Sequence, residues 1–342
     1  MEYNIHISGN APWLFPTDSY FGLLWYDDNK AIEMPKKIPF KGEWGEILTT
    51  VVSFRDTYPM PKKLDLVWLS LIEKKFYVVE AELPSLFMEN KWKMEDENGN
   101  SLFSHIVIGM APYGQVAIWL SGFKKSILLE WIQGEETSVE ISDYIPYYSG
   151  QRIEDYCNSI VGEDVIRKTK LPSRHLFDKY MQQFTYRYMI EFAHWNKDRE
   201  IWQNNNEEIQ SEFNYIEETL FDGTHDKLHN DVLMQYHQAG KPHKIYVQWK
   251  INKTEYTAQF YLNDEDICNI FDRFYGAHPE TKTDFMIRID SEKNKYELAL
   301  YRYGLKEPQV ISESTYQLLV FKNKFEYYRS ENYNQPKGAW IW

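Results

Sequence analysis

Two stretches with the same alternation of apolar and polar residues constrain the fold of this chain more than any other feature. LDLVWLSLIEKKFYVVEAEL spans residues 64–83, and IYVQWKINKTEYTAQFYL spans residues 245–262. Apolar side chains recur at every second position in each stretch, which is typical of a β-strand with one buried face. A short segment interrupts each alternation, SLIEKK in the first and INKTE in the second, and predicts a β-hairpin.

The two hairpins keep a common register. When Trp68 is aligned with Trp249, Tyr77 and Tyr256 follow them after nine and seven residues. The difference is even, and an even shift leaves every side chain on its own face of the sheet. We therefore interpret the hairpins as an internal repeat in which both tryptophans face inward.

Further elements follow each hairpin in the same order. NDEDICNIFDRFYG has a helical period, with Asn263 as the N-cap and Gly276 as the terminator, and PSLFMENKW is its shorter counterpart. Each copy then shows more strands: residues 104–110, 115–122 and SILLEWIQ in the first, and residues 284–290, 296–304 and YQLLVFKN in the second. The sequence thus predicts an α+β fold of two related antiparallel ββαββ-type sheet units.

The segment between the copies is predicted to be helical. Its main helix is expected over residues 174–202, and shorter helices over 206–222 and 225–238. The first of these rests on a stripe of large apolar residues, most of them aromatic: Phe177, Met181, Phe184, Tyr188, Phe192 and Trp195. The expected organisation is a first sheet unit over residues 1–150, a helical segment over 151–240 and a second sheet unit over 241–342. The proline-broken residues 10–28 are expected to drape across the first sheet.

Charge and composition narrow the range of partners. The chain of 342 residues carries 51 Asp and Glu against 38 Lys and Arg, a formal net charge of −13. This balance argues against binding to nucleic acid and to anionic lipid, both of which need a face rich in Lys and Arg. It suits a basic protein partner or solubility alone. The aromatic fraction is 17%, and such rings fill cores and also anchor interfaces.

The cysteines and the N-terminus favour a cytoplasmic location. Cys157 and Cys268 are far apart and form no CxxC motif, so no disulfide framework is expected. The start, MEYNIHISGNAPW, has neither the basic nor the apolar region of a signal peptide. No run of eighteen apolar residues predicts a transmembrane helix, so we expect no membrane insertion.

Three motifs give the chain a family resemblance. PKKLDLVWLSLIEKKFY with a following LP lies in residues 61–84, IVIGMAPYGQVAIWLSG in 106–122, and YMQQFTYRYMIEF in 180–192. Together, over roughly residues 10–200, they resemble an uncharacterised bacterial family, domain of unknown function 2931. The W-x-S-x-x-E and P-x-G-x-x-x-x-W patterns are its most specific parts, and the second hairpin region looks like a diverged copy.

The resemblance implies a binding role rather than a named activity. No catalytic residues are known for the family, so none is transferred to this sequence. Many members look like lipoproteins, whereas this chain shows neither a leader nor a lipobox cysteine. Some relatives stand beside toxin genes of bacterial secretion systems, in the position of immunity proteins, and this implies a cognate toxin as the partner.

A histidine pair is the best candidate for metal chemistry. His225 and His229 lie four residues apart in a stretch predicted to be helical, where they would share a face as zinc ligands often do. The glutamate of an HExxH motif is missing, and His237 or Asp231 could supply a third ligand. The alternative is that these are ordinary polar residues of a first helical turn.

Other candidates are weaker. Glu191, His194, Asp198 and Glu200 could form an acid–base site, or they could be the solvated side of the aromatic helix. No GxSxG, P-loop, GxGxxG or EF-hand pattern is present, and no cofactor is expected. Near the C-terminus, Tyr333, Trp340 and Trp342 either dock on the chain or meet a partner.

The sequence therefore favours a non-enzymatic protein-binding protein, specifically an immunity protein that neutralises a secreted antibacterial toxin. The alternatives are a metal-dependent hydrolase that uses His225 and His229, and an adaptor or scaffold protein. The oligomeric state and the binding surface are not predicted.

Overall fold

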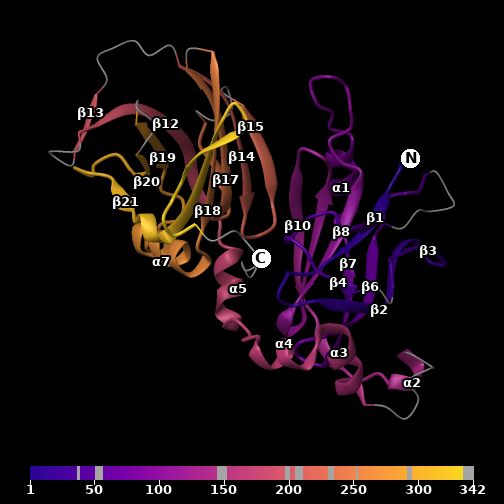
Figure 1. The fold of residues 1–342 in the computed structure, drawn as a ribbon. Helices are drawn as coiled ribbons and strands as arrows, with labels where there is room; N and C mark the ends of the chain where they lie inside the picture. Colours follow the sequence, from indigo (N-terminus) through magenta and orange to yellow (C-terminus); the bar gives the residue numbers. More distant parts are fainter. Residues whose placement is uncertain are drawn as a thin grey trace. The chain divides into compact units, whose positions relative to one another are not determined.

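The computed structural model describes residues 1–36, 39–50, 57–144, 152–196, 201–204, 211–229, 235–251, 253–290 and 295–333. The chain divides into two compact units. The first takes in Met1–Arg174 together with Asp222–His225, and the second takes in His175–Phe221 and the described residues from Asp226 onward. Both units are rich in strands (Figure 1).

Two sheets build the first unit. One has the strand order β11-β7-β6-β2-β3, with β4 also paired to β2, and the other contains β10-β9-β8-β1-β5. The strands of the first are β2 (Thr17–Asp27), β3 (Lys30–Glu33), β4 (Pro39–Phe40), β6 (Lys63–Ser70), β7 (Lys75–Glu82) and β11 (Glu135–Thr137). Those of the second are β1 (His6–Asn10), β5 (Thr49–Thr50), β8 (His105–Ala111), β9 (Gln115–Ser121) and β10 (Ser126–Gln133).

Strand β6 shows why its sequence is apolar on both faces. Leu64, Leu66 and Trp68 point into the main core, which they share with apolar residues of β8 and β9. Val67 and Leu69 point to the opposite face and pack with residues of the helices that cover it. These helices are α2 (Ile141–Tyr144), α3 (Ile153–Val161) and α4 (Glu163–Lys168), and the short α1 (Ser85–Trp92) follows β7.

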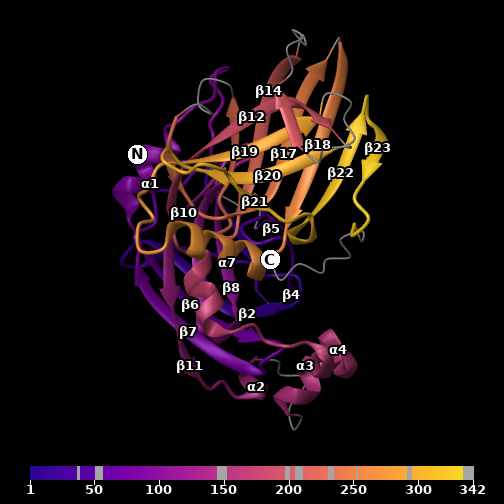
Figure 2. The ribbon, with the colours of Figure 1, turned by 90° about the vertical axis from the view of Figure 1, so that its left-hand side faces the viewer.

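The second unit is also built from two sheets. One sheet contains β23-β22-β18-β17-β14, and the other is β13-β12-β19-β20-β21, with β16 also paired to β12 (Figure 2). Their bounds are β12 (Phe184–Asn196), β13 (Ile201–Asn204), β14 (Ser211–Leu220), β16 (His237–Ala239), β17 (Pro242–Ile251), β18 (Thr254–Leu262), β19 (Thr283–Asp290), β20 (Tyr296–Tyr301), β21 (Gln309–Ile311), β22 (Tyr316–Lys322) and β23 (Phe325–Arg329). The helix α7 (Asp264–Tyr275) follows β18, as α1 follows β7.

The paired hairpins are confirmed as hairpins in register. Trp68 lies opposite Tyr77 between β6 and β7, and Trp249 lies opposite Tyr256 between β17 and β18. The ring centroids are 5.5 Å apart in the first pair and 5.6 Å apart in the second. Both tryptophan side chains are fully buried. The α7 cap is also confirmed, because the Asn263 side chain accepts a hydrogen bond from the Asp266 backbone N–H.

The prediction of a helical segment between the copies is largely wrong. Residues 153–180 are mainly helical and end in α5 (Arg174–Tyr180), but residues 184–196 form β12 and residues 211–220 form β14. A spacing of four residues fits a helix face, yet it is also twice the strand period, so Phe184 and Tyr188 satisfy both patterns. The buried set Phe184, Tyr186 and Tyr188 has the strand period of two.

Three further expectations need correction. The sequence predicts antiparallel sheets, but two strand pairs are parallel. The β8–β9 hairpin joins the sheet of β1, where β8 runs parallel to β1, and the β19–β20 hairpin joins the sheet of β12, where β19 runs parallel to β12. SILLEWIQ and YQLLVFKN are not equivalent, since β10 pairs with β9 whereas β22 pairs with β18. Residues 17–27 do not drape across the sheet but form β2 within it.

Candidate functional site

A pocket of about 630 Å³ opens in the first unit where the β6–β7 turn meets the β8–β9 turn. We call it the hairpin pocket. Its lining combines two rings, two apolar side chains, two acids, two cations and an amide: Tyr77, Tyr113, Ile72, Leu171, Glu73, Glu136, Lys75, Arg174 and Gln133, together with Gly134.

The Glu73 carboxylate holds the two turns together. Its Oε1 accepts a hydrogen bond from the Tyr77 hydroxyl at 2.9 Å. The backbone N–H of Tyr113 donates to both of its oxygens, at 3.2 Å and 3.0 Å. A carboxylate that accepts several hydrogen bonds is a strong and directional partner, so Glu73 fixes the position of the Tyr113 backbone.

Tyr113 adopts an uncommon backbone conformation. Its φ is 64°, in the left-handed region that non-glycine residues rarely occupy. Gly114 follows with φ 77°, and a Cβ there would lie 2.8 Å from the Gly134 carbonyl oxygen, so this position requires glycine. The Tyr113 hydroxyl donates to the Pro172 carbonyl oxygen at 2.8 Å. A strained backbone conformation of this kind persists only where surrounding contacts hold the residue in it, and such residues cluster at binding sites.

Gln133 forms one wall of the pocket. Its Nε2 donates to the carbonyl oxygens of Tyr113 and Gly134, each at 2.7 Å. Its Oε1 accepts from Nε2 of the buried Gln115 at 2.8 Å and from Nη2 of Arg174 at 2.6 Å. At the rim, Lys75 and Glu136 form an ion pair at 2.7 Å.

The tyrosines of the pocket act as neutral hydrogen-bond donors. Burial raises the pKa of Tyr77, and the nearby charge of Glu73 raises it further. The pKa of Tyr113 is raised by the same two causes, burial first. Both hydroxyls therefore stay protonated at neutral pH, which suits recognition by shape and hydrogen bonding better than nucleophilic or base catalysis.

The hairpin pocket joins two of the three motifs that carry the family resemblance. Glu73 is the last residue of the W-x-S-x-x-E pattern, and Tyr113 lies inside P-x-G-x-x-x-x-W between Pro112 and Gly114. The sequence reveals both motifs, but no local pattern indicates that they meet. Only the pairing of β6 with β7 and of β8 with β9 brings their turns together.

Replacing Glu73 by alanine is expected to destabilise the first unit by about 2 kcal/mol, because the Tyr113 N–H and the Tyr77 hydroxyl lose their acceptor. Urea unfolding measures this change. Glu80→Ala on the same hairpin is the matched control, since Glu80 forms an exposed ion pair with Lys63 and no other ion pair among the described residues. This change should cost less than about 1 kcal/mol. Equal costs for the two variants would contradict the role given to Glu73.

A second cluster of titratable groups is buried in the second unit. The Glu218 side chain on β14 accepts a hydrogen bond from the Tyr188 hydroxyl at 2.6 Å. The Tyr186 hydroxyl lies 3.5 Å from the same oxygen and donates to the Gly240 carbonyl at 2.9 Å. Nε2 of His237 lies 3.9 Å from the other oxygen, within the range of an ion pair. The sequence suggests His237 only as a metal ligand and gives no sign of this cluster, because its members are far apart in the chain.

His237 makes the stability of this unit depend on pH. Burial acts to lower the pKa of His237, but the attraction of Glu218 outweighs burial, so the pKa is raised above 6.5. The protonated imidazole therefore stabilises the folded state fully below the unfolded pKa, and this contribution is lost as pH rises through the folded pKa. The destabilisation caused by His237→Gln should shrink from pH 6 to pH 9 in chemical unfolding. A destabilisation that stays constant or grows with pH would contradict this assignment.

The metal hypothesis loses its geometric basis. His225 and His229 lie on a strand, β15 (His225–His229), and not on the predicted helix. Four residues of extended chain span about 13 Å, so the two imidazoles do not sit side by side as they would on consecutive helical turns. Within the described part of the chain, no three His, Cys, Asp or Glu side chains gather as metal ligands would.

The predicted acid–base site also differs from the structure, because Glu191 and His194 do not lie together. Glu191 and His194 belong to β12, where an odd separation puts them on opposite faces. Glu191 pairs with Arg288 at 2.7 Å, and His194 lies 3.8 Å from Asp290. Asp198 and Glu200 lie outside the described residues.

Of the C-terminal rings, Tyr333 packs on its own chain. Its ring centroid lies 6.3 Å from that of Tyr261, and the Arg329 guanidinium lies 5.1 Å above it. Trp340 and Trp342 fall outside the described residues.

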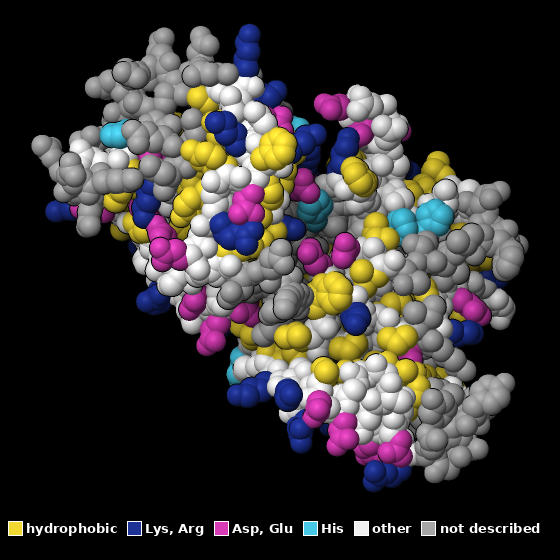
Figure 3. All heavy atoms as spheres, viewed as in Figure 1, with side chains coloured by type: hydrophobic (Ala, Val, Ile, Leu, Met, Phe, Trp, Pro, Cys, Tyr) yellow, Lys and Arg dark blue, Asp and Glu magenta, His cyan; other side chains and the backbone are white. Residues whose placement is uncertain are grey.

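On the face of the molecule drawn in Figure 3, Lys and Arg side chains are interspersed with acidic ones. Among the described helices, none has the length and apolar character needed to cross a bilayer.

Among the comparisons with known proteins, a family model gives a match, and this match lies within the first unit. No curated protein matches the chain, and no solved structure matches it. The aromatic motif in residues 180–192 lies beyond the part of the chain that a family model matches. Residues 7–170 match the model described as "Protein of unknown function (DUF2931)", so the resemblance to this family is confirmed over nearly all of the first unit.

Proposed function

We propose that this protein is a non-enzymatic protein-binding protein, specifically an immunity protein that neutralises a secreted antibacterial toxin. The observation that carries this proposal is that polar side chains lining the hairpin pocket are held in place by hydrogen bonds within the chain. Glu73, Gln133 and the Tyr113 hydroxyl all bond to other groups of the same chain. A pocket held in this way is a preorganised surface, and preorganisation favours tight binding because little conformational entropy is lost.

The composition of the pocket also suits a protein partner. Tyr77 and Tyr113 supply aromatic surface, Ile72 and Leu171 supply apolar surface, and charged side chains lie beside them. Aromatic anchors within a polar rim are typical of protein interfaces. The net charge of −13 would speed encounter with a basic toxin.

We further propose that the two units are diverged copies of one module. The strand order β11-β7-β6-β2 corresponds to β22-β18-β17-β14, and β10-β9-β8-β1 corresponds to β21-β20-β19-β12. The second hairpin lacks the glutamate that holds the hairpin pocket together, because the W-x-S-x-x-E pattern reads W-K-I-N-K-T from Trp249. Duplication followed by loss of one site would leave toxin recognition to the first unit.

A cytoplasmic location fits this role. Cys157 and Cys268 are both free and buried, and thiols stay reduced in the cytoplasm. There the protein would meet a toxin that has entered the cell.

Co-expression with the product of the neighbouring gene tests the function. The neighbour expressed alone should stop growth, and co-expression of this protein should restore it. Leu171→Asp, at the pocket rim, should abolish protection, whereas Leu86→Asp on the exposed side of α1 should leave it intact. A harmless neighbour, or toxicity unchanged by co-expression, would refute the immunity role.

A further inference from the structure

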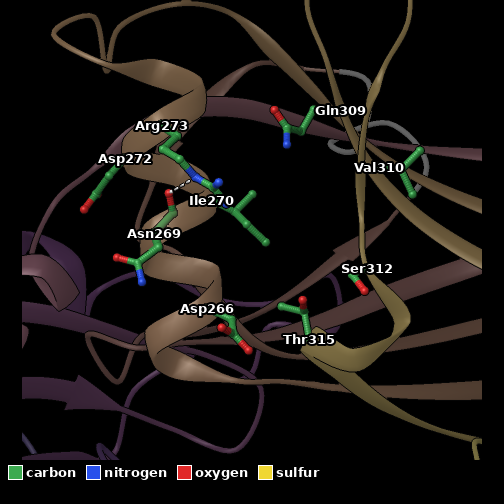
Figure 4. Close-up of a pocket in the computed structure, with 9 residues that line it drawn as sticks. All are labelled: Asp266, Asn269, Ile270, Asp272, Arg273, Gln309, Val310, Ser312 and Thr315. Atoms are coloured by element: carbon green, nitrogen blue, oxygen red, sulfur yellow. Dashed lines mark hydrogen bonds between the residues drawn. The ribbon is translucent and has the colours of Figure 1, made fainter.

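A second hollow lies within the second unit, between α7 and the last strand of its sheet. We call it the helix groove; its volume is about 530 Å³. Figure 4 shows its lining, which comes from α7, from β21 and from the 3-10 turn after it: Asp266, Asn269, Ile270, Asp272, Arg273, Gln309, Val310, Ser312 and Thr315. The hollow thus has a helix on one side and a strand on the other.

The helix presents one face to the groove. Asp266, Ile270 and Arg273 are spaced by four and three residues, which puts them on one side of α7. Figure 4 shows the Ile270 side chain extending toward the side of Gln309 and Val310, while Asp272 points away. Asp272 is occupied elsewhere, in an ion pair with Lys179 at 2.9 Å.

The strand side is a sheet edge. Among the described residues, β21 pairs with β20 on one side and ends the sheet on the other. A strand in this position presents unpaired backbone N–H and C=O groups, which can pair with an added strand. The Val310 side chain is 50% exposed beside this edge, so an incoming strand would also cover apolar surface.

Arg273 supplies an available cation. Its Nε donates to the Asn269 carbonyl oxygen at 3.2 Å. Its two terminal nitrogens have no acceptor within the described part of the chain. A guanidinium is a fork of donors that matches a carboxylate. Because Asp266 lies on the same helix face, the groove as a whole does not favour a polyanion, and a single carboxylate on the ligand complements Arg273.

We propose that the helix groove binds an extended peptide segment of a protein partner, which adds as a strand to β21 and places a carboxylate side chain against Arg273. Addition of a peptide strand beside a helix is a recurrent mode of recognition: main-chain hydrogen bonds supply affinity, and side-chain contacts supply specificity. The inference rests on the protein-binding function proposed above, but it concerns a separate surface in the other unit.

Peptide selection on the full-length protein tests this proposal. A phage-displayed library of random twelve-residue peptides is panned on the purified protein, and enriched peptides are synthesised and titrated by fluorescence anisotropy. We expect the peptides to carry Asp or Glu and to bind about tenfold more weakly to Arg273→Gln and to Val310→Lys. Val165→Lys is the matched control, because Val165 on α4 is 51% exposed, and it should change affinity less than about twofold.

Hydrogen exchange then locates the bound peptide. Saturation with the peptide should slow exchange of the backbone amides in residues 309–311. Failure to enrich peptides, unchanged affinity in both groove variants, or protection confined to other strands would each overturn the proposal. Toxin neutralisation is scored in a separate experiment, so a protein that protects cells but selects no peptide would refute the groove and leave the immunity role standing.

Discussion

Replacing Trp68 or Trp249 by alanine is expected to lower the free energy of unfolding of the affected unit by about 3–5 kcal/mol. Both side chains have no exposed surface, and each packs against the tyrosine opposite it in its hairpin. Truncation removes a large apolar surface and leaves a cavity that neighbouring strands cannot fill. Urea unfolding followed by circular dichroism measures the loss, and hydrogen exchange shows which unit carries it.

Conservative variants sharpen this test. Neither indole N–H of Trp68 and Trp249 has an acceptor among the described residues, so phenylalanine removes no hydrogen bond and should cost clearly less than alanine. Trp13, which is 41% exposed, is the control, and Trp13→Ala should cost less than about 1 kcal/mol. If the buried tryptophans cost no more than Trp13, they are not the core residues that the repeat predicts.

Gly223→Ala is expected to destabilise the first unit by about 2–4 kcal/mol, from two causes that add. Its φ is +80°, which strains any residue with a Cβ. The added Cβ would also lie 2.7 Å from Cζ2 of Trp119, a fully buried ring. That ring is fixed in place, because its Nε1 donates to the Asp222 carbonyl oxygen at 3.0 Å and its centroid lies 4.8 Å from that of Trp44.

Gly304→Ala separates the two causes. Gly304 has φ +97°, but a Cβ there meets no atom within 4 Å, so only the backbone strain remains and the cost should be about 1–2 kcal/mol. Thermal or urea unfolding of both variants gives the comparison. Combining Gly223→Ala with Trp119→Phe should cost less than the sum of the single changes, since the smaller ring relieves the overlap. Strict additivity would show that Trp119 does not limit the space at Gly223.

The strands and caps could be predicted because their signals are local. The alternation around Trp68 and Trp249 identifies inward-facing positions, and Asn263 and Gly276 mark the ends of α7. The stretch from Phe184 to Trp195 could not be assigned in this way, because aromatic residues spaced by four fit both a helix face and a strand face. Pairing with β19 over residues 186–193 decides for the strand.

The sites show the same division. The patterns that end in Glu73 and surround Tyr113 were visible in the sequence, whereas the hydrogen bonds between them depend on two turns that are forty residues apart. Glu218 contacts Tyr188 and His237, which are closer to it in sequence than Glu73 is to Tyr113. These contacts too are invisible in the sequence, because no regular helix or strand period connects the three residues. The pairing of His225 with His229 failed for the opposite reason, since its spacing rule assumed a helix where the chain forms a strand.

The sequence by itself determined the hairpins, their common register, the inward-facing tryptophans and the resemblance of residues 7–170 to the family of unknown function DUF2931. These features follow from side-chain alternation and turn chemistry within twenty or so residues, and such local preferences act wherever the chain is placed. Tertiary structure alone decided that the strands of each unit divide between two sheets, that β1 and β12 pair in parallel with later strands, and that Glu73 meets Tyr113. Contacts of this kind bury surfaces that are distant in the chain, so their free energy depends on the whole fold and leaves no local pattern to read.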